Sequence, residues 1–340
     1  MIIGLGLQRK RFDTVLDVWF PVIISDAESV LKDISSIISP QNNQFETLST
    51  QQLMNIAALI PSHISMIEQL STAISSPKSG YANWNAGLFT LPNLNSPVQN
   101  IQEAYLKLQL ISQRFIQPHG LNLEGIFGVL NNIAWTNRGP ILPQDCDSER
   151  ISAITQGQEL VVSHVDKFPY LLNYYVPSGV RIASGSQVRL GAYLGEGTTI
   201  MPAGYVNFNA GTKGNVMVEG RVSAGVVVDK DSDIGGGASI MGTLSGGNQD
   251  VISVGSHCLL GANSGIGISL GSGCTVEAGL YITAGMKVLD QTISPTHIVK
   301  ASTLSGRSNL LFIKDSQTGQ IICKSNTKTI QLNETLHSND

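Results

Sequence analysis

Aliphatic residues recur at every sixth position through the second half of the chain. A first series begins at Val176 and a second at Val222, and the phase slips by four residues in the stretch 207–217. Glycine often follows three residues later, where a tight corner needs its conformational freedom. The full series is Val176, Ile182, Val188, Leu194, Ile200, Val206, Val222, Val228, Ile234, Ile240, Gly246, Ile252, Cys258, Ser264, Leu270, Val276, Ile282 and Val288.

This six-residue period fits neither a helix nor a single alternating strand. It predicts a triangular prism of short parallel strands, each sending one aliphatic side chain to the axis. Three sides make a coil of about 18 residues, and coils stack at about 4.8 Å. We therefore expect a mainly β chain with a parallel β-helix of about six coils over 171–293. The resemblance to hexapeptide-repeat proteins implies a left-handed coil, an exception to the usual right-handed crossover.

Residues 1–170 lack this period and predict a mainly helical N-terminal domain. A helix-start signal at 25–29 precedes apolar residues at helical spacing, and Pro61 ends a later apolar stripe. We interpret these stripes as core-packing faces. The helices expected are about 25–38, 50–60, 98–115 and 123–135.

The chain leaves the repeat after about residue 293. Two apolar runs, 310–313 and 320–323, flank a polar turn. This pattern predicts a short C-terminal β-hairpin within 294–325. The polar residues 326–340 are expected to form a frayed tail.

Composition narrows the classes of function. The net charge is −4, charged residues make up 14%, and the longest basic run is Arg9–Arg11, so nucleic-acid binding is not expected. The four cysteines form no C-x-x-C pair, which favours a reduced, cytoplasmic setting. No apolar stretch approaches the ~20 residues that span a bilayer, and the N-terminus lacks the order of a secretory signal, so no membrane partner is expected.

A hexapeptide prism does not dictate a reaction. A carbonic anhydrase of this architecture needs three zinc-binding histidines, and the repeat contains only His257. Regular threonine ladders, which an ice-binding face requires, are also absent from the sequence. His257 could serve as the base of an acetyltransferase, but we favour a surface corner histidine. Cys258 occupies an inward repeat position and is interpreted as a buried structural thiol.

The break in the period contains the most distinctive charges. Glu219 and Arg221 lie there beside Gly220, in a neighbourhood otherwise poor in charge. Acyl transfer from a thioester to an amine needs a base for the amine proton, and a cation can hold a substrate carboxylate. Glu219 could be that base and Arg221 that cation. A surface ion pair that fixes the loop explains the same spacing equally well.

Long runs in and around the repeat resemble the tetrahydrodipicolinate N-succinyltransferase family, in its longer form. The resemblance covers about residues 125–320 and is weak over the first hundred residues. The runs are IAWTNRGP (133–140), VRLGAY (188–193), VNFNAGT (206–212), MVEGR (217–221), DIGGGASIMGTLSGG (233–247), LLGANSG (259–265), VKA (299–301) and LSGRSNLLF (304–312).

The resemblance implies a homotrimer with active sites between neighbouring prisms. It implies that succinyl-CoA, a co-substrate and not a bound cofactor, gives its succinyl group to the amine of L-2-amino-6-oxopimelate in lysine and diaminopimelate biosynthesis. The catalytic glutamate falls on Glu219, acting as general base or through an acyl-anhydride. The family positions that bind the acyl donor match Arg221, Gly236 and Ser239. The family positions that line the path of CoA match Ala262, Glu277, Ala278, Gly285 and Lys300.

Two departures from the family pattern bear on ligands. Family members often carry consecutive basic residues after Phe312, and here Lys314 alone keeps the charge, so Lys314 joins the expected CoA-binding residues. Acidic metal ligands of some relatives match Ser186 and Ala203, so no metal is expected. Two alternatives remain: an acetyl-CoA-dependent acyltransferase acting on another amine, and an inactive solenoid scaffold.

Overall fold

The computed structural model describes residues 1–75, 80–242 and 250–327. Gly246 of the aliphatic series, the end of the run 233–247 and most of the predicted polar tail therefore lie outside the described residues. Within those ranges, no helix is long and apolar enough to cross a membrane.

The chain folds as two compact units. Residues 1–110 and 120–169 form the N-terminal unit. Residues 111–119, together with those from 170 onward, form the β-helix unit. The predicted boundary at 170 is therefore close to the structural one, apart from the short segment 111–119.

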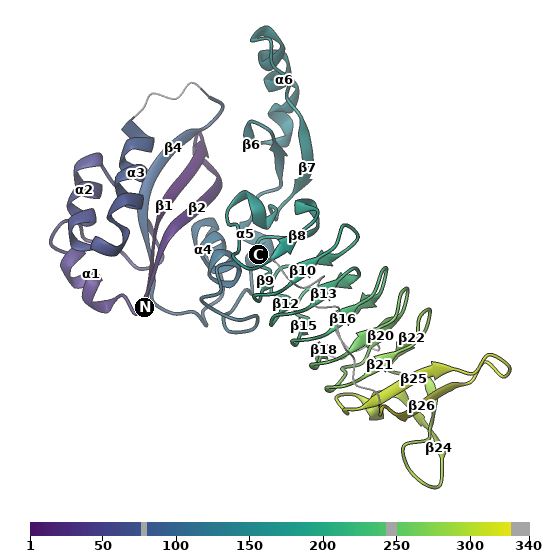
Figure 1. Cartoon of the computed structure of the whole chain (residues 1–340). Coiled ribbons are helices and arrows are strands. Elements are labelled where there is room, and N and C mark those ends of the chain that lie inside the picture. Colours follow the sequence, from purple (N-terminus) through teal and green to yellow (C-terminus); the bar gives the residue numbers. More distant parts are fainter. Residues whose placement is uncertain (76–79, 243–249, 328–340) are drawn as a thin grey trace. The chain divides into compact units, whose positions relative to one another are not determined.

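An antiparallel sheet of order β2-β1-β4-β3 forms the centre of the N-terminal unit (Figure 1). Its strands are β1 (Ile2–Arg11), β2 (Thr14–Ser25), β3 (Phe45–Thr47) and β4 (Asn83–Leu91). Helices α1 (Glu28–Ile34), α2 (Thr50–Leu59) and α3 (Ile64–Ser75) pack on one face, around fully buried residues such as Ile3 and Leu53. Helix α4 (Ile101–Ser112) covers the other face. There, Gln109 accepts a hydrogen bond from the Phe20 amide and donates one to the Val18 carbonyl.

The second part of this unit is a three-stranded sheet of order β6-β5-β7 with two short helices. The elements are α5 (Ile126–Val129), β5 (Ile133–Thr136), β6 (Gly139–Ile141), α6 (Cys146–Thr155) and β7 (Val162–Asp166). The helix predicted over 123–135 is therefore wrong beyond α5. Gly125 adopts a left-handed conformation before α5, and Ile133–Thr136 pairs with β7 as a strand.

The helices predicted over 50–60 and 98–115 are confirmed as α2 and α4, and the signal at 25–29 overlaps the start of α1. The sequence analysis missed the four-stranded sheet. Its β1 pairs with the adjacent β2 and also with the distant β4, where Ile2 stands opposite Leu91, and the pairing with β4 leaves no local periodic signal. Helices α3 and α6 were also missed.

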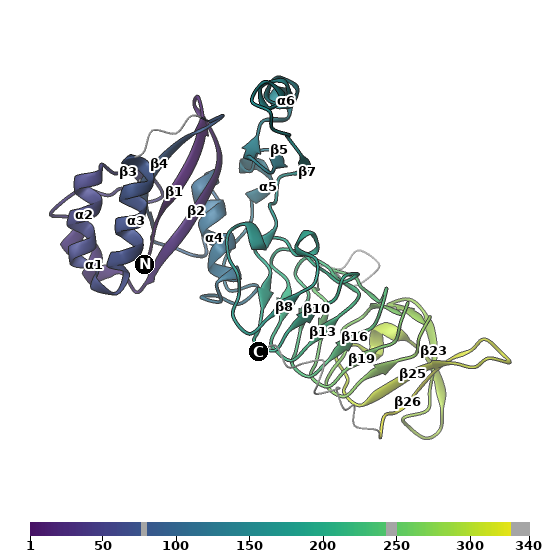
Figure 2. The ribbon, with the colours of Figure 1, turned by 45° about the horizontal axis from the view of Figure 1, so that its top comes forward.

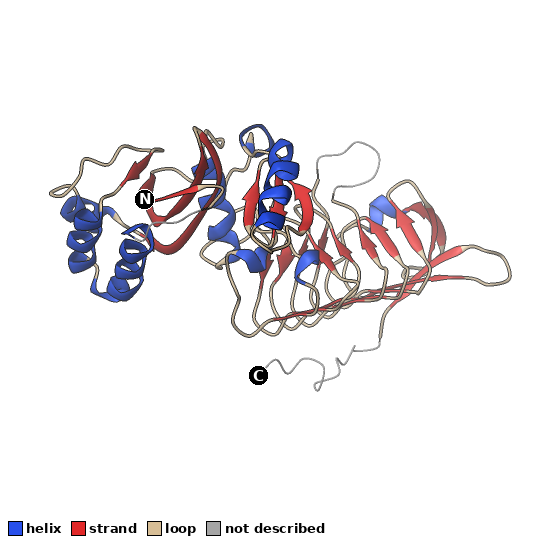
Figure 3. Cartoon of the chain, turned by 90° about the horizontal axis from the view of Figure 1, so that it is seen from above, coloured by secondary structure: helices blue, strands red, loops and turns tan. Residues whose placement is uncertain are grey.

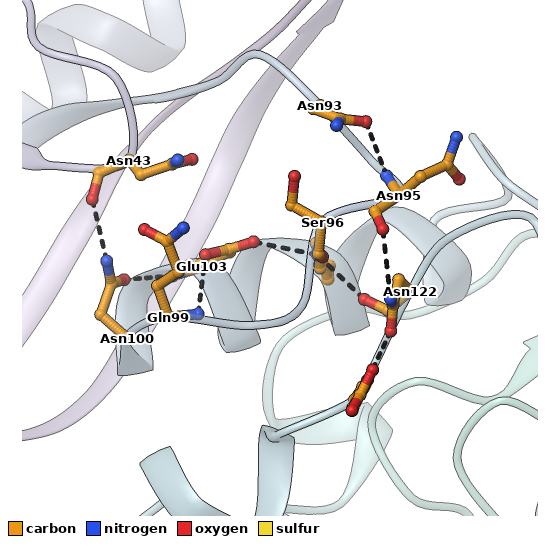
Figure 4. A network of polar contacts seen from close by, with 10 residues as sticks. Asn43, Asn93, Asn95, Ser96, Gln99, Asn100, Glu103 and Asn122 are labelled. Atoms are coloured by element: carbon orange, nitrogen blue, oxygen red, sulfur yellow. Dashed lines mark hydrogen bonds and ion pairs between the residues drawn. The ribbon is translucent and has the colours of Figure 1, made fainter.

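A buried ion pair lies inside the N-terminal unit, on α4. Lys107 Nζ lies 2.9 Å from Glu103 Oε1, and both side chains are almost completely buried. Lys107 also donates to the carbonyls of Ser96 and Asn122. Glu103 Oε2 accepts from the amide of Gln99, within the polar network drawn in Figure 4. The pair thus joins the segments before and after α4.

The β-helix unit is a left-handed parallel β-helix with three faces (Figures 2 and 3). The first face holds β8 (Arg181–Ile182), β10 (Thr199–Ile200), β13 (Met217–Val218), β16 (Asp233–Ile234), β19 (Leu259–Leu260) and β21 (Thr275–Val276). The second holds β11 (Tyr205–Val206), β14 (Arg221–Val222), β17 (Ser239–Ile240), β20 (Gly265–Gly267) and β22 (Tyr281–Thr283). The third holds β9 (Tyr193–Leu194), β12 (Gly211–Thr212), β15 (Val227–Val228) and β18 (Ser253–Val254).

The aliphatic series forms the core of this unit. From Val188 onward, every described member of the series is buried. The prediction is wrong for Val176, whose side chain is 76% exposed, because the first coil begins only at β8. Ile182, at that end of the prism, is half-buried.

The break in the period lies later than predicted. Thr212 and Val218 keep the six-residue spacing and are buried, and the step from Val218 to Val222 is then shortened to four. The short corner is therefore Glu219–Gly220, outside the stretch 207–217. A second short step joins Ile266 to Leu270, and it was missed.

The second short step explains why the predicted series contains the small residues Cys258 and Ser264. They lie two residues before Leu260 and Ile266, which occupy the strands β19 and β20. All four side chains are buried, so each corner sends a small residue inward before the larger one.

The C-terminal strands extend the first face in the order β24-β23-β26-β25-β21. The predicted hairpin is confirmed as the antiparallel pair β25 and β26. The bounds are β23 (Lys287–Asp290), β24 (His297–Lys300), β25 (Leu310–Lys314) and β26 (Ile321–Ser325).

Candidate active site

Four stacked corners between the first and second faces form a line along one edge of the prism. We call this line the corner ladder; it comprises residues 219–220, 235–238, 261–264 and 277–280. Backbone amides of Gly237, Asn263 and Gly279 donate to the carbonyls of Glu219, Gly236 and Ala262, at 3.1, 2.8 and 2.9 Å.

Those three donors have positive φ, which glycine and asparagine tolerate best. The ladder therefore brings together Glu219, Gly236, Ala262, Glu277 and Ala278, which are scattered along the sequence.

Lys314 extends the ladder by one step. Its backbone amide donates to Glu277 Oε2 at 2.7 Å, and the Glu277 amide donates to the Phe312 carbonyl. Four steps of about 4.8 Å span about 19 Å from Glu219 to Lys314. The Glu277 carboxylate is thus held by the backbone of the next coil.

Glu219 occupies the shortest corner of the ladder. Its side chain is half-buried, and its amide donates to the Ile234 carbonyl at 2.8 Å. Glu219 Oε2 lies 3.3 Å from the point where a Cβ on Gly236 would stand. A Cβ on Gly220 would lie 2.2 Å from the Ala238 carbonyl oxygen, so only glycine fits there without a backbone shift. The carboxylate therefore faces the glycine corner of the next coil.

Arg221 and Ser239 are in direct contact, and each immediately follows its corner of the ladder. They are paired in register on β14 and β17, and Arg221 Nη2 donates to Ser239 Oγ at 2.6 Å. The same outward row continues through Gly265 to Tyr281, whose ring covers Gly265. The exposed guanidinium is thus oriented beside the corner that carries Glu219.

Asp233 is a further ionisable group at this corner, and the sequence analysis missed it. It lies on β16 in register with Met217, so its strand borders the strand that leads into Glu219. Its Oδ1 is buried and has no hydrogen-bond partner within the part of the chain that the structure describes. Burial, followed by the negative charge of Glu219, raises the pKa of Asp233 to about 6. The sequence did contain a signal for Asp233: because Ile234 was assigned to the prism axis, the preceding Asp233 must lie on the outer face.

Gly285 and Lys300 lie on a different element, around the β23–β24 hairpin. The Ala301 amide donates to the Met286 carbonyl, which ties the end of β24 to the segment after Gly285. Lys300 stands directly opposite Lys287, and both are exposed. Like charges directly opposite each other are destabilising, and an anion bound between the two lysines would relieve that repulsion.

His257 and Cys258 have the surroundings that their structural interpretations predict. His257 stands at a corner with φ 55°, half exposed, and its Nε2 is 3.8 Å from Asp231 Oδ2. The Cys258 thiol is buried and contacts the Gly271 carbonyl oxygen, and its pKa is raised by its hydrogen bond with Cys274 and by burial. These features favour a surface corner and an inert thiol.

Comparisons with known proteins identify the family of this chain. Residues 251–284 match the family described as "Hexapeptide repeat of succinyl-transferase", and 130–170 match "Tetrahydrodipicolinate N-succinyltransferase middle". The chain is 48% identical to the 2,3,4,5-tetrahydropyridine-2,6-dicarboxylate N-succinyltransferase of Vibrio cholerae, covering 99% of this chain and 98% of that protein. It is 45% identical to the enzyme of the same name from Pseudomonas aeruginosa PAO1, covering 99% and 97%.

A solved structure has the same fold. It is the 1.90 Å crystal structure of a Campylobacter jejuni protein, provisionally described as a 2,3,4,5-tetrahydropyridine-2-carboxylate N-succinyltransferase. The TM-score is 0.84 at 30% identity, and the match covers 97% of this chain and 93% of that one. Identity of this level over almost the whole length leaves one conclusion: the chain is an acyltransferase that belongs to the 2,3,4,5-tetrahydropyridine-2,6-dicarboxylate N-succinyltransferase family.

Proposed function

We propose that this chain transfers the succinyl group of succinyl-CoA to the amine of L-2-amino-6-oxopimelate, the ring-opened form of tetrahydrodipicolinate, and releases CoA. The observation that carries the proposal is the short corner, in which Gly220 alone separates Glu219 from Arg221, whose guanidinium contacts Ser239. The names of the full-length relatives support the same reaction.

Glu219 acts as the general base in this proposal. The amine nitrogen attacks the thioester carbonyl carbon, and its proton passes to the Glu219 carboxylate. The tetrahedral intermediate then collapses, the C–S bond breaks, and the CoA sulfur takes up a proton. Such proton transfer typically contributes 10²- to 10⁴-fold to a rate.

Arg221 holds the free carboxylate of the succinyl group. A guanidinium can form two charge-assisted hydrogen bonds to a carboxylate, which fixes its orientation. Ser239 Oγ accepts from one Arg221 nitrogen, so the guanidinium is oriented before the donor binds. An acetyl group has no carboxylate to place there, and the pair therefore favours succinyl-CoA over acetyl-CoA.

CoA follows the corner ladder away from Glu219. The small side chains of Ala262 and Ala278 leave room for an extended arm, and the corner of Gly236 admits the thioester beside Glu219. Glu277, Lys314, Gly285 and Lys300 line the far part of the path, where the two lysines suit phosphate groups. CoA serves as a co-substrate, and the reaction as proposed needs no permanently bound cofactor or metal.

The assembly proposed is a cytoplasmic homotrimer, in which a neighbouring copy closes the exposed side of the corner ladder. The exposed Arg221 and the half-buried Glu219 are consistent with a site that a second chain completes. Light scattering tests this point: a mass of three chains is expected, and full activity from a single chain would contradict it.

The test of function is CoA thiol release from succinyl-CoA in the presence of tetrahydrodipicolinate. Wild type should be active, and Glu219→Gln should lose about 10²- to 10⁴-fold in kcat. Glu196→Gln, an exposed carboxylate at another corner, is the matched control and should keep full activity. Undiminished activity of Glu219→Gln, or a preference for acetyl-CoA, would contradict the assignment.

A further inference from the structure

The surroundings of Asp233 in the fold do not stabilise its carboxylate. It faces outward on β16, and its neighbours in register are Met217 and Leu259, which are uncharged. Its Oδ1 is buried with no hydrogen-bond partner in the described ranges. Burying a carboxylate oxygen without a donor costs free energy, so the folded chain gains no stabilising bond from this oxygen.

The electrostatic surroundings of Asp233 point to Glu219. Burial makes the largest contribution to the raised pKa of Asp233, and the negative charge of Glu219 raises that pKa further. The Glu219 amide bonds to the carbonyl of Ile234, the residue after Asp233, so the two carboxylates belong to adjoining coils. The preceding residue, Ser232, is neutral and donates to the Gly255 carbonyl. Pairs of carboxyl groups with unequal environments are typical of acid–base sites.

We propose, building on the function proposed above, that Asp233 is the second carboxylate of the acyl-transfer site and that its negative charge stabilises the attacking amine nitrogen. That nitrogen gains positive charge as the C–N bond forms, and Glu219 then removes its proton. Asp233 exchanges no proton in this step and acts through its field, which is strong in a partly buried site. Asp233 therefore supplies a negative charge that acts on the nitrogen, and Glu219 remains the base.

The proposal predicts a specific change on the acidic side of the pH profile. Below about pH 6 Asp233 binds a proton, its charge disappears, and kcat should fall. Asp233→Asn keeps the shape but never carries the charge. It should lower kcat about 10- to 100-fold at pH 8, as expected for the loss of one charge in a partly buried site. The KM for succinyl-CoA should not change, because the charge acts on the amine.

The experiment compares pH profiles of kcat for wild type, Asp233→Asn, Asp233→Glu and Glu219→Gln. Asp233→Asn should lose the decline near pH 6 that wild type shows, and Asp233→Glu, which restores the charge, should recover most of the rate. A purely structural role would leave the profile of Asp233→Asn like that of wild type, and that result would overturn the proposal. Asp233→Ser repeats the test if Asn does not fold.

The outcomes separate this inference from the proposed function. Wild type that transfers no succinyl group would refute the function itself. Wild type that is active and needs Glu219, with an unaffected Asp233→Asn, would refute the role of Asp233 alone.

Discussion

The two units of this chain are stabilised in different ways. In the β-helix unit each strand pairs with the strand one coil later, as Met217 does with Asp233, and the core repeats the same kind of residue. In the N-terminal unit β1 pairs with β2 and with the distant β4, and a buried ion pair, Glu103–Lys107, joins the segments before and after α4. Repetition spreads stability over many similar contacts, whereas a distant pairing concentrates it in a few.

The largest effect is expected where stability is concentrated. Lys107→Ala leaves Glu103 as an unpaired buried charge and removes two donors from the carbonyls of Ser96 and Asn122. We expect a loss of about 3–5 kcal/mol in the free energy of unfolding. All three tryptophans, Trp19, Trp84 and Trp135, belong to the N-terminal unit, so urea unfolding followed by their fluorescence measures this loss.

The control for Lys107 is an exposed ion pair of the same unit. Arg150→Ala breaks the Arg150–Asp147 pair on α6, which is solvent-exposed and should contribute about 0.2–1 kcal/mol or less. Equal losses for the two variants would mean that burial of the Lys107 pair does not matter.

A core truncation in the β-helix unit should cost somewhat less and stay local. Ile234→Ala removes a completely buried side chain between two coils, and a loss of about 2–4 kcal/mol is expected. Because each coil contacts mainly its neighbours, hydrogen exchange should increase in peptides near Ile234. Val176→Ala, at a position that is 76% exposed, should change nothing. Exchange that increases equally over the whole β-helix would contradict this picture.

The same contrast explains what the sequence could predict. Side chains such as Val188, Ile234 and Ile282 were assigned to the prism axis from spacing alone, and all are completely buried. One side of the prism repeats every six residues, so its signal is local. The strand Ile133–Thr136 was taken for the end of a helix, although it pairs with the nearby β6 as well as with β7, which lies beyond another strand and a helix.

The candidate site shows a similar limit. Glu219 and Arg221 stood out as charges at a break in the period, and Arg221 and Ser239 are indeed in contact. The location of the break was wrong, because Thr212 is a polar residue at an inward position and does not look like a core residue. Asp233 was missed because its raised pKa comes from burial and from Glu219 on another coil, and neither is visible in its own segment.

A moderate effect is expected at the corner that joins fold and site. Gly220→Ala places a Cβ 2.2 Å from the Ala238 carbonyl oxygen, so the backbone must shift, at a cost of about 1–3 kcal/mol. The shift would move Glu219, and kcat should fall together with stability. Gly128→Ala is the control in the N-terminal unit, because nothing lies within 4 Å of its added Cβ. Unchanged kcat in Gly220→Ala would show that the short corner does not position the carboxylate.

The smallest expected effect is a gain in stability, and it is expected for Asp233→Asn. The folded-state pKa of Asp233, about 6, lies above that of an unfolded chain, about 4. The folded state therefore binds the proton more tightly, and this contribution to stability is present below pH 4 and lost as the pH rises through 6. Asp233→Asn removes the charge, so it should be more stable than wild type at pH 8.

The gain should be about 1–2 kcal/mol, less than the full shift implies because Asp233 is partly exposed. It should disappear at pH 4, where wild type is also neutral at this position. Urea unfolding at both pH values, followed by far-UV circular dichroism, measures the difference. A variant that is more stable and slower is expected when a charge is kept for the reaction at the expense of the fold. If Asp233→Asn proved less stable at pH 8, the carboxylate would instead have a stabilising partner, and its charge would belong to the fold.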